Sequence, residues 1–341
     1  MIRQTATIAA TIWAALSCNP ATGQTPPPAI LTIDLAGYVE YQADVYDPSK
    51  YGKNPDLTPS AGIGLFGVAT QLADIVAVNG QPAKGIYVGR SRGVSASPTP
   101  HQGALADGAI GDIAVTALRE HVFEILKPDS TVIGTIVSMG FSGGPVPPGS
   151  PSGPSGGNWA IVGGTGAFLG ARGQIEGWGG TAFAKAQSAS MTEDPFNRRL
   201  LHQAGIFRFT LHLIPMYVPE ILPTANGPAV VHSNDFTLVT ASKPATAGEV
   251  LSLFVTGLGP VNPNVDPGQP FPSSPLDAVN SPVDVIVNGK PSEVLGTAGY
   301  PGSVDGYQVN FRLPTGTTKG TASIQVTAAW ISGPSVSIAV Q

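Results

Sequence analysis

The sequence predicts an all-β protein in two parts, an antiparallel β-barrel of about eight strands followed by a β-sandwich. Stretches in which apolar and polar residues alternate recur along the 341-residue chain, and such alternation is typical of half-buried strands. The 43 glycines and 33 prolines supply frequent turns and disfavour long helices. Charged residues make up only 11% of the chain, whereas about a quarter is usual, and this composition favours an exported β protein.

Residues 1–23 have the features of an export signal. The run 5–16 is apolar but too short to span a bilayer, and cleavage after Gly23 would follow small residues. The alternative is a lipid anchor at Cys18, because residues 15–18 are similar to a bacterial lipoprotein box, although Ala15 departs from the usual residue there. Free secretion is favoured, and both routes place the mature protein outside the cell or in its envelope. Cys18 is the only cysteine, so no intramolecular disulfide is expected.

The chain after this signal alternates apolar and polar residues with a period of two. Leu31, Ile33 and Leu35 fall on one face, and the alternation continues to Val45. At about 3.3 Å per residue this stretch is too long for one straight strand, so we expect a bend or bulge at Gly37. The other expected barrel strands are residues 63–70, 74–78, 85–90, 113–126, 131–139, 159–163, 174–186 and 206–214.

The asparagine–glycine pair Asn79-Gly80 lies between two of these strands. This dipeptide accepts the positive φ angles of a type I′ turn better than most others. It therefore predicts a tight hairpin, which would fix the register of its two strands.

The glycine-rich segment 158–173, NWAIVGGTGAFLGARG, has two interpretations. A dinucleotide-binding loop needs a glycine where Leu169 stands and a helix directly afterwards, but the continuation GQIEGWGG disfavours a helix. The other interpretation is a barrel turn, because residues 161–173 resemble a signature of dirigent proteins, which share a β-barrel with allene oxide cyclases. The resemblance implies such a barrel over residues 29–216. Extended to function, it implies a cofactor-free reaction in an apolar cavity.

The segment 142–157, SGGPVPPGSPSGPSGG, has almost no large apolar side chains and is expected to form a mobile surface loop between barrel strands. Its start completes a G-x-S-x-G pattern that would make Ser142 a hydrolase nucleophile. That motif requires a helix directly after the serine, and the prolines that follow prevent one. Ser142 is therefore interpreted as a loop residue.

Prolines concentrated in residues 215–228 indicate a boundary, with a linker at 217–227 and a second domain at 228–341. Short strand-like stretches follow at the spacing of a β-sandwich. Residues 256–260, TGLGP, and 307–310, YQVN, resemble the Solibacter uncharacterised C-terminal domain family, an Ig-like module at the ends of exported bacterial proteins. The resemblance implies an Ig-like β-sandwich and export, without an activity. Asn288-Gly289 predicts another hairpin.

Nucleic acid, metal and cofactor sites are poorly supported. The net charge of −5 comes without a basic run, which argues against nucleic-acid binding. Residues 262–273 begin like a calcium loop, but Gly268 is one position late and Ser273 stands where a bidentate acid is needed. The histidines lack the close pairing typical of zinc sites. No metal or cofactor is therefore expected.

Four residues are candidates for ligand binding in the barrel, namely Arg172, Glu176, Tyr87 and Arg90. Arg172 belongs to the dirigent-like signature and could donate to an oxyanion or phenolate in a low-dielectric lumen. Glu176 could be a lumenal acid or a partner of Arg172, and Tyr87 and Arg90 are expected along the same cavity. The competing interpretation is structural, with an Arg172–Glu176 pair closing the barrel and Tyr87 in its core. No catalytic residue is assigned, because the dirigent aspartates have no clear counterpart.

Two classes of function stay open. The first is a secreted or cell-envelope binding or scaffold protein, in which the barrel holds a small apolar ligand and the Ig-like module serves attachment or packing. The second is a cofactor-free cyclase or dirigent-type coupling-guidance enzyme acting in the lumen. An enzyme needs an open cavity with Arg172 or Glu176 pointing inward, whereas a scaffold barrel can be filled by its own side chains. The expected partners are a small apolar molecule, a cell-surface or envelope component and, by the dirigent resemblance, further copies of the chain.

Overall fold

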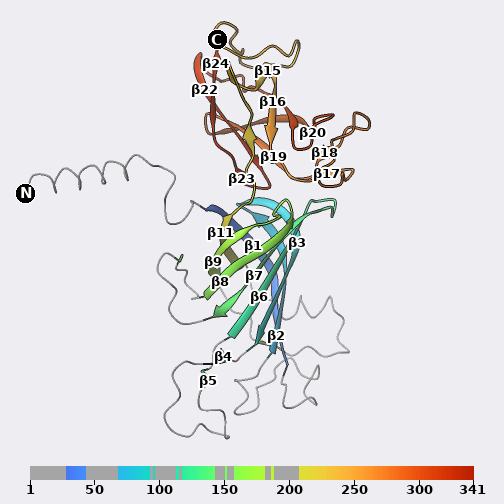
Figure 1. The fold of residues 1–341 in the computed structure, drawn as a ribbon. Helices are drawn as coiled ribbons and strands as arrows, with labels where there is room; N and C mark the ends of the chain where they lie inside the picture. Colours follow the sequence, from blue (N-terminus) through green and yellow to red (C-terminus); the bar gives the residue numbers. More distant parts are fainter. Residues whose placement is uncertain are drawn as a thin grey trace, which may run out of the picture.

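The computed structural model describes residues 28–43, 68–92, 95–96, 113–114, 117–142, 150–151, 157–180, 186–187 and 207–341. All regular secondary structure in these residues is β, arranged as a closed barrel with a second, open and curled sheet above it (Figure 1). The predictions of an all-β protein and of a barrel are confirmed. The expected export signal, Cys18 and most of the segment 142–157 lie outside the described residues. No helix in the described part is long and apolar enough to cross a membrane.

Eight antiparallel strands close the barrel as an up-and-down meander, in which successive strands are neighbours. They are β1 (Ala29–Ala43), β2 (Val68–Val78), β3 (Gln81–Arg92), β6 (Ala117–Leu126), β7 (Val132–Ser142), β8 (Gly157–Gly166), β9 (Arg172–Gly180) and β11 (Phe207–Ile214). Closure results because β1 pairs with both β2 and β11. Beside the barrel, β4 (Ser95–Ala96) pairs with β5 (Ile113–Ala114), and β10 (Ala186–Gln187) runs parallel to the end of β1.

The two backbone predictions for the barrel are confirmed. Gly37 has a φ of 63°, and the register between β1 and β2 shifts between Ala36 and Val39, so the long first strand bends there. Asn79 and Gly80 have φ angles of 49° and 75°, as a type I′ turn between β2 and β3 requires. The side chain of Asn79 also ties this turn to β1, because its Oδ1 accepts a hydrogen bond from Thr32 N at 2.8 Å.

Three of the expected strands differ in extent from the observed ones. Residues 63–70 and 74–78 were expected as separate strands, but Val68–Val78 is one continuous strand. The alternation fails at Gln71, which faces the barrel interior and is fully buried although it is polar. The expected strand 113–126 contains β5 and β6, of which only β6 pairs within the barrel.

The second unit, residues 220–341, is built on one branched and curled sheet in the order β12-β16-β21-β20-β19-β22-β23. Its long strand β20 pairs with β19 through residues 290–292 and with β21 from Glu293 onward, with a register shift between Val294 and Gly296. The strands of this sheet are β12 (Glu220–Ile221), β15 (Val230–His232), β16 (Val250–Thr256), β17 (Val261–Asn262), β18 (Ala278–Val279), β19 (Val283–Val287), β20 (Lys290–Gly299), β21 (Tyr307–Arg312), β22 (Gly320–Ala328), β23 (Ile331–Ser332) and β24 (Val336–Val340).

Part of the expected linker 217–227 belongs to this second unit. Strand β12 pairs with β16, and β13 (Pro223–Thr224) forms a small separate hairpin with β14 (Gly227–Pro228). The connection between the barrel and the second unit is therefore short, and the second unit starts within a few residues of the last barrel strand.

The hairpin predicted at Asn288-Gly289 in the second unit is confirmed, because the two residues have φ angles of 49° and 77°.

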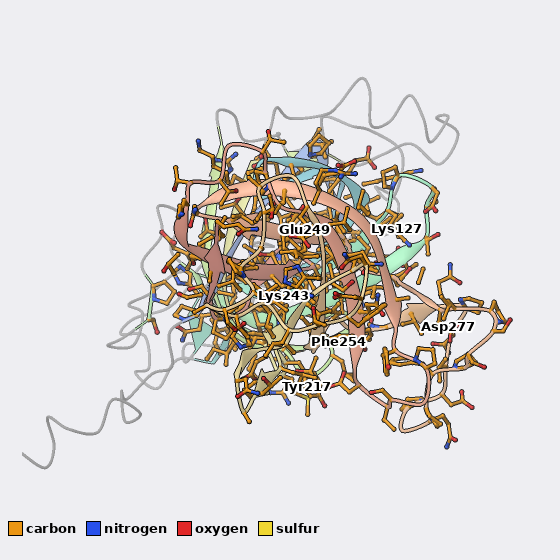
Figure 2. All side chains as sticks on the ribbon, turned by 90° about the horizontal axis from the view of Figure 1, so that it is seen from above. Lys127, Tyr217, Lys243, Glu249, Phe254 and Asp277 are labelled. Carbon is orange, nitrogen blue, oxygen red and sulfur yellow. The ribbon has the colours of Figure 1, made fainter. Side chains whose placement is uncertain are left out.

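The second unit packs against the upper end of the barrel, where the β2–β3, β6–β7 and β8–β9 turns lie. Ala329 and Ile331, at the turn between β22 and β23, belong to the same buried apolar cluster as the barrel core. Beside them, Trp330 Nε1 donates to Gln81 Oε1 at 3.2 Å, and Asn280 Nδ2 donates to Val132 O at 2.7 Å. In the view from above, the second unit lies over the barrel (Figure 2). The two units thus share a packed junction.

Candidate binding sites in the lumen and at the junction

A row of small and polar residues crosses four neighbouring strands on the lumenal face of the barrel. The register places Gln71 of β2 opposite Gly89 of β3, Gly89 opposite His121 of β6, and His121 opposite Ser138 of β7. Gln71, His121 and Ser138 are fully buried. Buried polar side chains are uncommon in barrel cores and need hydrogen-bond partners. We call these residues, together with Tyr87, the lumenal polar row.

Tyr87 connects this row. Its hydroxyl donates to Gln71 Oε1 at 3.3 Å and lies 2.8 Å from His121 Nδ1. A hydroxyl has a single proton, so with this assignment His121 Nδ1–H donates to the tyrosine oxygen. The hydroxyl lies over Gly89, where any Cβ would overlap both the Tyr87 oxygen and the Gln71 amide oxygen. Glycine at position 89 therefore makes the arrangement sterically possible.

His121 is an uncharged group in this setting. Burial, with a smaller contribution from the nearby Arg119 guanidinium, lowers the pKa of His121 from 6.5 to about 3. Both causes disfavour the protonated ring, because a charge loses its hydration on burial and a neighbouring positive charge repels it. At neutral pH the lumen thus holds a neutral imidazole in contact with a tyrosine hydroxyl.

Aromatic side chains fill the lumen around the polar row. The ring centroids of Tyr87, Phe123 and Phe209 are mutually 5.2 Å apart, and the His121 ring lies 4.7 Å from that of Trp159. All five side chains are at most 1% exposed. A small barrel whose inward rings touch one another is a packed core in this region.

Three of the four residues expected along the lumen lie on the outer face of the barrel instead. Arg90 and Arg172 are exposed, and Arg172 Nη1 donates to the carbonyl oxygens of Val162 at 2.8 Å and Ala171 at 3.1 Å. Glu176 makes its contact with His212 instead, at 2.9 Å between Oε2 and Nε2. The expectation that the side chains of Arg90, Arg172 and Glu176 point into the lumen was wrong. Side chains alternate between the two faces of a strand, and because the neighbours of these residues point inward, these residues point outward.

Only Tyr87 of the four predicted residues faces the lumen, where it is 1% exposed. The sequence argument did not single out Gln71, His121 or Ser138 as lumenal residues. A signal was present for His121, because it lies two residues from the apolar Phe123 and therefore on the same face of the strand. A polar residue on the apolar face of a strand is informative, and it is most informative when it recurs on neighbouring strands.

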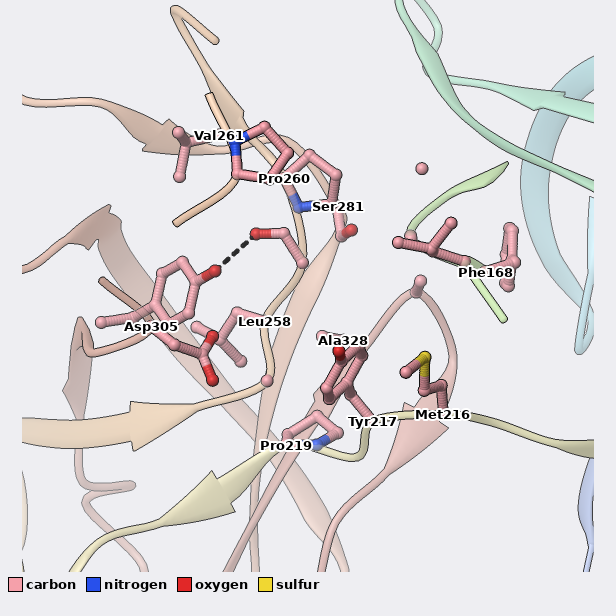
Figure 3. Close-up of a pocket in the computed structure, with 18 of the residues that line it drawn as sticks. Phe168, Met216, Tyr217, Pro219, Leu258, Pro260, Val261, Ser281, Asp305 and Ala328 are labelled. Atoms are coloured by element: carbon pink, nitrogen blue, oxygen red, sulfur yellow. Dashed lines mark hydrogen bonds between the residues drawn. The ribbon is translucent and has the colours of Figure 1, made fainter. Parts of the chain in front are cut away.

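A pocket of about 460 Å³ lies at the junction between the barrel and the second unit. One wall is the β8–β9 turn, residues 166–169, with Met216 and Tyr217 just beyond β11, and the other includes residues 257–261 and 264–269. Across the cavity, Phe168 and Met216 face Leu258, Pro260 and Val261 (Figure 3). We call this cavity the junction pocket.

The two sequence motifs that suggested resemblances therefore meet at this pocket. The turn at 166–169 belongs to the dirigent-like signature, and Gly259 belongs to the TGLGP stretch of the second unit. They lie close together, since a Cβ built on Gly259 would be 3.7 Å from Ala167 Cα. At Gly259 a φ of 86° also favours glycine, so the backbone there both turns and approaches the barrel closely.

Four apolar side chains that line the junction pocket are open to solvent. Leu169, Met216, Tyr217 and Val304 line it and are 58%, 59%, 57% and 53% exposed. Large apolar side chains scattered singly over a surface are ordinary, but four around one cavity form a patch that water solvates poorly. Such a patch is typical of a binding surface.

Among the described residues, no group of three or more His, Cys, Asp or Glu side chains is placed to hold a metal ion. The fold defines an all-β protein with a closed antiparallel barrel joined to a curled sheet. Comparison of the chain with models of protein families, with curated proteins and with solved structures found no match. The dirigent-like and Solibacter-type resemblances thus remain predictions.

Proposed function

We propose that this is a secreted or cell-envelope binding and scaffold protein that holds a small apolar molecule in the junction pocket. The observation that carries the proposal is the cluster of exposed apolar side chains around a cavity of about 460 Å³. Pockets for small ligands commonly have about 300–1,000 Å³ and mainly apolar walls. A ligand that covers these exposed apolar side chains would remove apolar surface from water, which favours binding.

The binding site in this proposal differs from the lumen expected from the sequence. Packed rings occupy the middle of the lumen, and Arg172 and Glu176 lie on the outer face, so the features expected of a lumenal cavity are lacking among the described residues. The junction pocket instead draws its walls from both units. In this proposal the barrel is a rigid scaffold for one wall, and the second unit supplies the other.

Further parts of the proposal concern location and partners. Export is supported by the signal-like residues 1–23, with free secretion favoured over a lipid anchor at Cys18. The second unit is proposed to be an Ig-like sandwich, supported by the antiparallel pairing of its strands and by the TGLGP stretch. Attachment to a surface or envelope component, and assembly of several copies, follow from the resemblances alone.

A neutral dye tests the proposed site. Nile red fluorescence should rise saturably with the wild-type protein, and Leu169→Ser should weaken its binding about fivefold, since roughly 1 kcal/mol of apolar burial is lost. Leu276→Ser is the matched control, because Leu276 is also 58% exposed but does not line the pocket. Equal binding by the two variants, or no saturable binding by the wild type, would refute the proposal.

The lumenal polar row favours a second candidate, a cofactor-free cyclase or dirigent-type enzyme. A neutral imidazole and a tyrosine hydroxyl in a water-poor lumen could donate and accept hydrogen bonds at a reacting molecule. Native mass spectrometry of the protein from its own secretion medium separates the candidates. A bound molecule lost on Tyr87→Phe but kept on Leu169→Ser would favour the lumen, and the opposite pattern would favour the junction pocket.

A further inference from the structure

The charged side chains of the junction pocket are all of one sign. Asp266 and Asp305 line the pocket, and no lysine, arginine or histidine is among the described residues that line it. Both aspartates are exposed to solvent. Because carboxylates attract positive charge and repel negative charge, this lining discriminates between ligands that are equally apolar.

Arg172 follows a pocket-lining residue in the sequence but does not itself line the pocket. Ala171 lines the pocket, but the guanidinium of the next residue, Arg172, is held on the outer face by the carbonyl oxygens of Val162 and Ala171. Asp266 and Asp305 are therefore the charged groups of the described lining. An anionic ligand such as a fatty acid would therefore meet repulsion without a compensating cation.

The remaining polar and aromatic groups of the pocket fit a cation as well. The Tyr307 hydroxyl donates to Gly259 O at 2.7 Å, so its proton is already engaged within the protein. Burial and then the Asp305 carboxylate raise the pKa of Tyr307, which keeps this hydroxyl neutral. The Phe271 and Tyr307 rings, with centroids 5.1 Å apart, also line the pocket, and aromatic rings attract cations.

We propose that the junction pocket selects an apolar molecule that carries a positive charge, an organic ammonium ion, and that Asp266 and Asp305 set this preference. The inference rests on the proposed function, because it requires the junction pocket to bind a small molecule. It adds the chemical class of the ligand. The apolar body would cover exposed apolar side chains such as Leu169, Met216 and Tyr217, with the ammonium group directed to the two carboxylates.

Three probes with one apolar body test the preference, namely 1-naphthylmethylamine, 1-naphthalenemethanol and 1-naphthoic acid at pH 7. Isothermal titration at low salt should show the amine binding at least about fivefold more tightly than the alcohol, and the acid most weakly. Raising the salt to about 0.5 M should reduce the preference for the amine, because exposed charges are screened. Binding of the alcohol should be little affected.

Substitutions test whether Asp266 and Asp305 cause the preference for the amine. In the double variant Asp266→Asn and Asp305→Asn, the affinity for the amine should fall to within about twofold of the affinity for the alcohol, and the affinity for the alcohol should not change. Asp235→Asn is the control, because Asp235 is a solvent-exposed aspartate outside the pocket lining, paired with Lys243 at 2.6 Å. It should retain the full preference. Since Asp266 and Asp305 are both exposed, their replacement by the isosteric asparagine should not disturb folding, which far-ultraviolet circular dichroism can verify.

The outcomes separate this inference from the proposed function. Preference for the amine that disappears in the double variant supports the inference. Equal binding of the three probes, tighter binding of the acid, or a preference that survives in the double variant overturns the charge assignment while leaving the binding site in place. Failure of all three probes to bind overturns the junction pocket as a binding site, and the inference with it.

Discussion

The buried His121 should make the barrel less stable in mild acid. Its pKa is lowered from 6.5 to about 3 in the folded protein, mainly by burial, so between these values the unfolded chain binds a proton that the folded barrel does not. The neutral His121 therefore costs no stability above pH 6.5, and the free energy of unfolding falls as the pH falls toward 3. Within this window each pH unit lowers the free energy of unfolding by about 1.4 kcal/mol, which gives roughly 2 kcal/mol between pH 7 and pH 5.

The perturbation that isolates this effect is His121→Gln. Glutamine does not titrate, and its amide can still hydrogen-bond to the Tyr87 hydroxyl, which lies 2.8 Å from Nδ1 in the native protein. Between pH 7 and pH 5 the wild type should lose roughly 2 kcal/mol more stability than this variant. His212→Gln is the control, because His212 lies on the outer face and pairs with Glu176. The control should retain the acid sensitivity that arises from His121.

Urea unfolding at pH 7, 6 and 5, followed by tryptophan fluorescence, measures these differences. The Trp159 ring lies 4.7 Å from that of His121 and so reports on this part of the barrel. In parallel, the ring resonances of His121 in the folded protein should keep their neutral chemical shifts down to about pH 4.5. Parallel stability curves for wild type and His121→Gln, or a His121 ring that titrates near 6.5, would refute the burial of a neutral imidazole.

Three further substitutions test packing. Gly89→Ala should destabilise the barrel by about 1–3 kcal/mol in urea unfolding, because the new Cβ would overlap the Tyr87 hydroxyl and the Gln71 amide. Gly296→Ala is the control and should change the stability little, because a Cβ at position 296 meets no atom within 4 Å. Tyr87→Phe should cost about 1–3 kcal/mol in the same assay by removing a buried hydrogen-bond partner, and no loss would contradict the polar row. Ile331→Ala should cost about 2–5 kcal/mol and lower the thermal midpoint of the barrel, and a change confined to the second unit would contradict the shared junction.

The barrel was predictable because its signals are local. In β1 the inward residues Leu31, Ile33 and Leu35 alternate with polar ones, and the turn at Asn79-Gly80 needs positive φ angles that few dipeptides accept. The failure at Gln71 has the same origin. A buried polar residue breaks the apolar alternation, although the backbone continues as one strand, because the Tyr87 hydroxyl on the neighbouring strand satisfies it.

The candidate site was far less predictable. Direction into or out of a barrel reverses with a shift of one residue, so Arg172 and Glu176 were assigned to the wrong face. The junction pocket lay beyond sequence reasoning for another reason. Its walls come from segments about 90 residues apart, around Phe168 and Leu258, and their meeting depends on how the second unit packs on the barrel. Each motif could be identified alone, but their juxtaposition is a property of the fold.

The most direct test of the proposed function locates the ligand. A crystal structure of the protein soaked with 1-naphthylmethylamine should show the naphthyl group between the β8–β9 turn and residues 257–261, against Leu169 and Met216, with its amine toward Asp266 or Asp305. Density for the probe in the lumen beside Tyr87, or binding in solution with no density at the junction, would contradict the assignment of the site.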